Sequence, residues 1–194
     1  MRRQWTTALA AVILAAGAAA TTVPTASAAT STDCSTVWGS LDRQDRTAPY
    51  QPQALTNIRT GAHECFDRLV IDVPGTSPEN PLAYRIHYMN GNTIYQAGSG
   101  TPITVNGGAV LEIVVGASTY DPATWQKVYP ARSGDLLPGV DLTGYRTFKD
   151  TRFAGSMEGE TQFGLGVRAR LPFDVFQLDN RLVIDVAHSW TAAD

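Results

Sequence analysis

The sequence predicts an all-β fold, specifically a two-sheet β-sandwich with pseudo-symmetric halves and few or no long helices. The first observation is a repeated heptapeptide: residues 67–73 read Asp-Arg-Leu-Val-Ile-Asp-Val, and residues 180–186 repeat them with Asn in place of the first Asp. In each copy Leu, Ile and Val alternate with Arg, Val and Asp, which gives an extended strand one apolar face and one mixed face. Two matched strands near the two ends of one domain indicate a pseudo-symmetric sheet structure.

The second observation is that strand-like segments recur along the chain, while helical patterns nearly vanish. Turn sequences separate these segments; the pair Asn90-Gly91, for example, suits a two-residue hairpin because both residues tolerate positive φ. Many short strands with turns between them are typical of a sandwich or a barrel. The expected strands are residues 54–60, 68–73, 82–89, 93–96, 110–117, 145–153, 163–171, 174–178 and 181–187.

The N-terminus has the pattern of a secretory signal peptide over residues 1–28. Arg2 and Arg3 precede an apolar run, and Ala26-Ser27-Ala28 has the small-x-small form of a cleavage site. The apolar run is shorter than the roughly 20 residues that span a bilayer, which disfavours the alternative of a membrane anchor. We therefore expect a secreted or cell-wall-associated protein without a stable membrane anchor. An irregular segment over residues 29–51 would then precede one domain over residues 52–190.

Charge and cysteine content narrow the classes of function. The formal net charge is −3, and removal of residues 1–28, which contain two basic and no acidic residues, leaves −5. Nucleic-acid binding requires clustered positive charge, so no nucleic-acid partner is expected. Cys34 and Cys65 are the two cysteines. An even count in an exported chain indicates a disulfide, because the compartment is oxidising; two buried free thiols are the alternative.

Three segments resemble a known family. Residues 66–73, 162–173 and 175–188 are similar to the AMIN-like domain of secreted proteins and lipoproteins of high-GC Gram-positive bacteria, and the resemblance spans about residues 52–189. It implies a β-sandwich of two symmetric sheets. Because the AMIN domain proper is the non-catalytic targeting module of cell-wall amidases and secretins, the resemblance also implies association with peptidoglycan.

One candidate binding surface is the segment over residues 163–171. Leu165, Val167, Ala169 and Leu171 are expected to alternate inward, which leaves a strip of Gly164, Gly166, Arg168 and Arg170 facing outward. Two outward glycines would expose flat backbone beside two guanidinium groups, and such a surface suits an extended glycan or peptide that carries a carboxylate. The alternative is that the glycines mark a bend or close sheet packing.

A second candidate surface is the long connection over residues 118–144, which carries Tyr120, Trp125 and Tyr129. Long connections in compact domains are usually functional or disordered, and three aromatic residues argue against simple disorder. Aromatic rings suit the apolar face of a sugar. The alternative is that these rings cover an open end of the sandwich as a small satellite core.

Catalytic and metal chemistry find little support in the sequence. Asp72 and Asp185 occupy equivalent positions of the repeat and are the one candidate pair for glycoside hydrolysis, but exposed strand carboxylates are the simpler interpretation. His63, His87 and His188 lack metal-ligand spacing. No nucleophile motif is present. We therefore expect no catalytic residues, no metal and no cofactor.

The sequence thus predicts a non-catalytic, secreted module that binds the cell envelope through peptidoglycan or another wall component. A protein–protein adaptor or inhibitor that binds another envelope protein is the alternative, and a wall-glycan hydrolase that uses Asp72 and Asp185 is a lower one.

Overall fold

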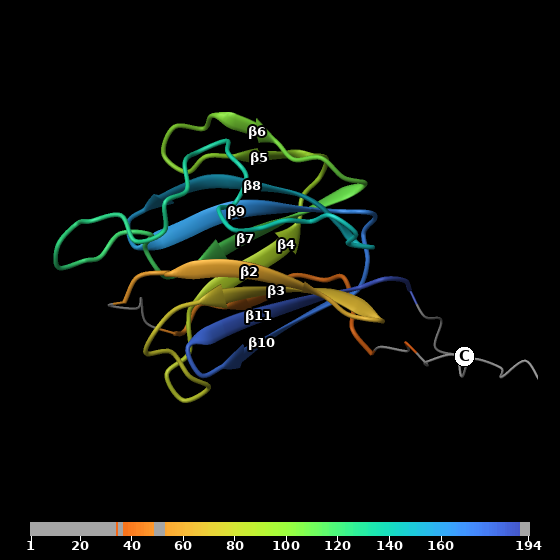
Figure 1. Ribbon diagram of the computed structural model, residues 1–194, viewed down its shortest axis with the longest axis horizontal. Helices are drawn as coiled ribbons and strands as arrows, with labels where there is room; N and C mark the ends of the chain where they lie inside the picture. The colour runs from red at the N-terminus through yellow and green to blue at the C-terminus, as the bar shows by residue number, and fades with distance from the viewer. Residues whose placement is uncertain (1–33, 35–36, 49–52, 191–194) are drawn as a thin grey trace, which may run out of the picture. The chain divides into compact units, whose positions relative to one another are not determined.

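The computed structural model describes Cys34, residues 37–48 and residues 53–190, which all belong to one compact unit. The predicted signal peptide at residues 1–28 lies outside the described residues. Within the described part of the chain every regular element is a strand and every strand pair is antiparallel, so the predicted all-β fold is confirmed (Figure 1). Each of the nine predicted strand segments overlaps an observed strand.

Two large sheets form the sandwich. The five-stranded sheet has the order β1 (Arg43–Asp45), β4 (Tyr84–Tyr88), β7 (Ala109–Val115), β9 (Glu160–Val167) and β8 (Phe148–Met157). The four-stranded sheet has the order β10 (Phe173–Leu178), β11 (Arg181–Ala187), β3 (Phe66–Asp72) and β2 (Asn57–Ala62). Strand β1 lies inside residues 29–51, which were expected to be irregular.

The two copies of the repeated heptapeptide lie side by side at the centre of the four-stranded sheet. Strands β3 and β11 pair so that Arg68 faces Asp185, Val70 faces Val183 and Asp72 faces Arg181. The inward side chains of both copies, namely Leu69, Ile71, Val73, Leu182, Ile184 and Val186, are fully buried in one hydrophobic cluster with residues of the five-stranded sheet. The apolar face that the alternation predicts for each copy is therefore confirmed, and both faces contribute to one core.

The one position at which the two copies differ has a structural reason. Asp67 is fully buried, and its Oδ2 accepts hydrogen bonds from the backbone N–H groups of Thr147 (2.6 Å) and Phe148 (3.0 Å), so it holds the start of β8 against β3. Asn180 instead lies in the turn between β10 and β11 with φ of 62°. Asn tolerates this left-handed conformation better than most residues. Asp67 therefore suits a buried position that needs an acceptor, and Asn180 suits a turn position with positive φ.

A third layer covers part of the outer face of the five-stranded sheet. Strands β5 (Thr93–Tyr95) and β6 (Pro102–Thr104) pair into a small sheet, which lies beside β8 and β9 in Figure 1. Ile94, Ile103 and Val105 from this region pack with Val110 and Ala154 of the large sheet to form a second, smaller core.

The covering layer contradicts the expected open strip at β9. A Cβ atom at Gly164 would lie 2.7 Å from Val105 Cγ2, and one at Gly166 would lie 1.9 Å from Asn106 O. Both glycines are buried because the connection around β6 packs directly on their backbone. The expectation that they expose flat backbone is wrong, and close packing between layers is the correct interpretation.

A disulfide joins Cys34 to Cys65, as predicted. It attaches the N-terminal segment beside the first residue of β3, where Trp38 packs edge-on against Phe66 with ring centroids 5.8 Å apart. The backbone of Gly39 then bridges to Phe173 at the start of β10. The N-terminal segment is thus held against one end of the four-stranded sheet.

Candidate functional site

The outer faces of the two sheets differ in accessibility. No strand among the described residues lies over the outer face of β10-β11-β3-β2. Its centre consists of Val70 and Val183, which are nearly fully buried by the longer side chains around them. Phe176 faces Val183 from β10, and Arg59 faces Val70 from β2. This face therefore presents aromatic and arginine side chains to solvent over a small apolar centre.

Arg68 is the best-held charged group on this face. Its Nε and Nη2 each donate to one oxygen of Asp185 at 2.7 Å. Its guanidinium carbon lies 5.1 Å from the ring centre of Phe66 and 5.5 Å from that of Phe176. The hydrogen bonds to Asp185 raise the pKa of Arg68, so it remains charged at every accessible pH. Two rings and one carboxylate thus fix this guanidinium without help from a ligand.

More aromatic and basic side chains gather at the end of the sheet where β3 begins. Phe66 is stacked on His63, with ring centroids 4.5 Å apart, and contacts Trp38 on another side. Trp190 is 56% exposed and donates its indole N–H to Arg170 O at 2.9 Å. The name aromatic–arginine cluster is used below for this surface. It comprises Trp38, Phe66, Arg68, Phe176, Arg168, Arg170 and Trp190.

The two arginines of the predicted strip belong to this cluster. Arg168 donates to the carbonyl oxygen of His188 just beyond β11, and the N–H of His188 in turn bonds to Cys65 O next to Phe66. Arg170 donates to Ser40 Oγ and O, and its guanidinium lies 5.0 Å from the ring centre of Tyr88. Arg168 and Arg170 therefore stay at the surface, although the two glycines predicted beside them do not.

The ring of Tyr88 lies against the guanidinium of Arg170. Its hydroxyl donates to Leu171 O at 2.8 Å and accepts from Leu171 N at 3.0 Å. Burial raises the pKa of Tyr88 to about 12, so the ring stays neutral under the guanidinium of Arg170. The backbone that carries Arg170 is thus fixed by a buried hydrogen-bond pair.

The long connection separates the three aromatic residues that the sequence grouped together. Tyr129 is 2% exposed, belongs to the main core and donates its hydroxyl to Pro138 O at 3.1 Å. Trp125 is 79% exposed at the tip of the loop with φ of 57°. Tyr120 forms a bridge to Lys127, whose ammonium lies 5.3 Å from its ring centre. Tyr129 therefore belongs to the core, while Tyr120 and Trp125 lie at the surface.

The geometry does not support Asp72 and Asp185 as a catalytic pair. They lie four residues apart in register along β3 and β11, which is about 13 Å along the strands. Carboxylates that hydrolyse glycosides lie roughly 5–9.5 Å apart. Each is also bound by arginine: Asp185 by Arg68, and Asp72 by Arg59 with Nε–Oδ2 of 3.0 Å. Asp185 is 2% exposed, so the expectation that both aspartates face solvent is wrong for Asp185.

The histidines are engaged in other contacts. His188 Nε2 lies 3.0 Å from His63 O and donates to it, and His188 Nδ1 lies 2.9 Å from the Thr147 hydroxyl. His87 lies on β4 with Nε2 3.5 Å from Glu112 Oε2. The described residues contain no group of three or more His, Cys, Asp or Glu side chains arranged to hold a metal ion. A search of the same residues for a helix able to cross a membrane found none.

Comparison with known proteins gives one match. The family model of the AMIN-like domain matches residues 53–188, which include every strand except β1. The chain belongs to the AMIN-like domain family. Searches of curated proteins and of solved structures found no match. Membership of this family suggests a cell-wall-related targeting module of the envelope.

Sequence reasoning missed most of the cluster on this AMIN-like domain. Phe66 and Arg68 lie two residues apart on the repeated strand, so the alternation could have placed both on its outward face. Phe176 is aligned with them by the pairing of β10 with β11. Trp38 and Trp190 reach the cluster through the disulfide and through a hydrogen bond to Arg170, and no local pattern indicates either contact.

Proposed function

We propose that this AMIN-like domain is a secreted, non-catalytic module that binds peptidoglycan through the aromatic–arginine cluster. The observation that carries the proposal is the uncovered outer face of the four-stranded sheet, where Phe66 and Phe176 flank the guanidinium of Arg68. The family membership and the predicted signal peptide support a place in the cell envelope.

The chemistry of the cluster suits a wall polymer. Aromatic rings pack on the apolar faces of sugars, and arginine forks bind the carboxylates that peptidoglycan peptides carry. Trp190 and Phe176 offer partly exposed rings, and Arg168 and Arg170 are exposed. Because the rings and guanidinium groups are already held by neighbours, a ligand would bind them with little loss of side-chain entropy.

The test is binding to purified sacculi, measured by co-sedimentation of the mature chain. We expect Phe176→Ala with Trp190→Ala to weaken binding about tenfold at every salt concentration, because stacking is insensitive to screening. Arg168→Ala with Arg170→Ala should weaken binding most at low salt, because exposed charges are screened beyond about 8–10 Å near physiological ionic strength.

Trp125→Ala is the matched control, because its exposed ring lies on the long connection away from the cluster. Loss of binding in this variant alone would move the site to Tyr120 and Trp125. Parent-like binding by all these folded variants would exclude both surfaces.

A protein–protein adaptor remains the second candidate because the four-stranded sheet ends in two edge strands, β2 and β10. An edge strand can pair with an extended segment of a partner through main-chain hydrogen bonds, largely independently of side chains. Failure of the parent chain to bind sacculi, together with specific capture of one envelope protein, would favour this function.

A further inference from the structure

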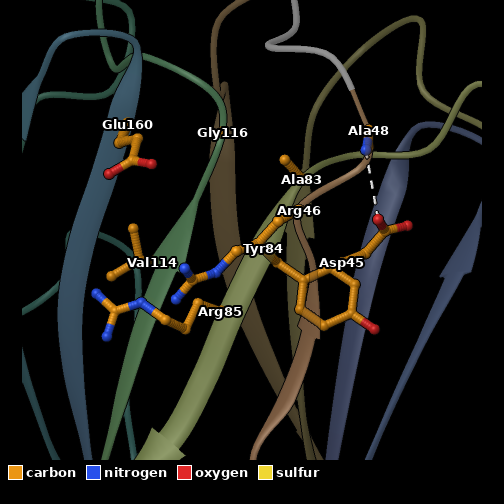
Figure 2. A pocket seen from close by; sticks show the side chains of 9 residues that line it. All are labelled: Asp45, Arg46, Ala48, Ala83, Tyr84, Arg85, Val114, Gly116 and Glu160. Carbon is orange, nitrogen blue, oxygen red and sulfur yellow. Dashed lines mark hydrogen bonds between the residues drawn. The ribbon is translucent and has the colours of Figure 1, made fainter.

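A groove on the five-stranded sheet is separate from the aromatic–arginine cluster. It has a volume of about 420 Å³. It lies at the end of the sheet where β1 and β7 end and where β4 and β9 begin. Figure 2 shows the side chains of Arg46 and Arg85 extending over Val114, with Glu160 at the far end. A second hollow shares Arg85, Val114 and Glu160 with it, so the groove continues across the sheet toward Gln96 and Gln162.

The two guanidinium groups in this groove are poorly neutralised. Arg46 is exposed and has no hydrogen-bond or ion-pair partner among the residues that the structure describes. Arg85 reaches Glu112 Oε2 with its Nη1 at 3.5 Å, which is long for an arginine–carboxylate contact. Glu112 is already bound by Gln162 Nε2 at 2.8 Å and lies 3.5 Å from His87. Most donors of both arginines thus remain available.

The nearest acidic lining residue on the Arg46 side does not serve as their counter-ion. Asp45 Oδ1 accepts hydrogen bonds from the N–H and hydroxyl of Thr47 at 2.9 and 2.8 Å, and from the N–H of Ala48 at 3.3 Å. The hydrogen bonds from Thr47 lower the pKa of Asp45, which therefore stays ionised within its own turn. In Figure 2 its carboxylate is directed toward Ala48. Arg46 has no partner among the described residues and Arg85 has only the long contact with Glu112, so two positive charges line one groove and favour an anion between them.

We propose that this groove binds the carboxylate of a peptide, with Arg46 and Arg85 as its ligands. A planar carboxylate matches the fork of a guanidinium, and two forks can hold its two oxygens. Glu160 at the far end disfavours densely charged polyanions, because a second negative group of the ligand would approach a carboxylate. The continuation toward Gln96 provides space for the peptide chain behind the carboxylate.

This inference goes beyond the proposed function, because it assigns a second carboxylate site to the opposite sheet, formed by residues outside the aromatic–arginine cluster. The probe is N-acetyl-alanyl-alanine, titrated into the mature chain and followed by amide chemical-shift changes or calorimetry. The same dipeptide with an amidated C-terminus and inorganic phosphate are the comparison ligands. We expect saturable binding of the free acid that weakens with salt, and at least about tenfold weaker binding of the amide.

Arg46→Gln and Arg85→Gln should each weaken binding of the free acid by about tenfold or more. Arg132→Gln, which changes an exposed arginine on the long connection, should bind as the parent does. If Arg85→Gln does not fold, Arg46→Gln alone decides, since Arg46 is exposed and its removal breaks no described contact. Equal binding of acid and amide, tighter binding of phosphate, or parent-like binding by Arg46→Gln would overturn the proposal.

None of these variants changes the aromatic–arginine cluster, and the dipeptide assay requires no wall material. A failure of this proposal is therefore distinguishable from a failure of wall binding through the cluster.

Discussion

The two sheets use their outward positions in opposite ways. On β9 the outward residues at the centre are Gly164 and Gly166, and a covering layer with its own small core packs directly on them. On β3 the outward residues are Arg68, Val70 and Asp72, and the flanking long side chains bury the valine, with no covering strand in the described part of the chain. In this molecule the outward glycines at the centre of β9 lie under a second layer, whereas the large outward residues of β3 cover their own face.

The strongest test of this comparison replaces one outward glycine on each sheet. Gly166→Ala places a methyl group 1.9 Å from the backbone oxygen of Asn106, so the covering layer must move. We expect a loss of about 3 kcal/mol or more in the free energy of unfolding. Gly61→Ala on β2 meets only His63 Nε2 at 3.5 Å and should be neutral or slightly stabilising. Urea denaturation of both variants measures the difference, and equal midpoints would show that the layer does not pack as described.

A second test compares the two ends of the repeated motif on the uncovered face. The register would allow two equivalent ion pairs, but Asp185 binds Arg68 while Asp72 binds Arg59 of β2 instead of the facing Arg181. Asp185 is almost fully buried and Asp72 is not. The neighbouring strands therefore break the symmetry that the sequence shows.

Asp185→Asn should cost about 2–3 kcal/mol, because it removes the carboxylate from a buried, doubly hydrogen-bonded pair. Asp72→Asn should cost no more than about 1 kcal/mol, because its pair with Arg59 is exposed. Thermal or urea unfolding of the two variants at low and moderate salt checks both values. An equal cost at both positions would contradict the asymmetry.

Features that depend on neighbouring residues in the chain could be predicted from the sequence, whereas features that depend on contacts between distant segments could not. Alternation of apolar and polar residues placed Ile71 and Ile184 in the core, because the period of a strand is a local property. It could not predict that Asp185 is buried, since Arg68, which binds Asp185, comes from the neighbouring strand β3. The covering layer at Gly166 was equally inaccessible, because an outward glycine is compatible with either an open or a covered surface.

The candidate site shows the same limit. Arg168 and Arg170 were predicted from the sequence and do lie in the cluster, whereas Trp38 reaches it through contacts made possible by the disulfide. Tyr129 had the same local appearance as Trp125, yet one lies in the core and the other in solvent. The three-residue strands β1 and β6 were not predicted, whereas β5, which has the same length, follows the Asn90-Gly91 turn sequence that marks its start.

The smallest expected effect concerns the rings that flank Arg68. Phe176→Leu keeps an apolar side chain over Val183 but removes the ring 5.5 Å from the guanidinium. A partly exposed cation–π contact contributes about 0.5–1 kcal/mol, and we expect a loss of that size. Tyr95→Leu on β5 is the matched control, because its ring is 57% exposed and has no ring contact among the described residues.

The contribution of the contact itself requires a double-mutant cycle that combines Phe176→Leu with Arg68→Gln, which removes the charge. If the ring stabilises the guanidinium, the two losses should add up to more than the loss of the double variant, since the second change removes a partner that is already gone. The Tyr95→Leu change should add to Arg68→Gln within about 0.3–0.5 kcal/mol, because distant sites are independent. A coupling of zero at Phe176 would leave Asp185 as the main residue that fixes Arg68, and the uncovered face would then depend on one ion pair rather than on its rings.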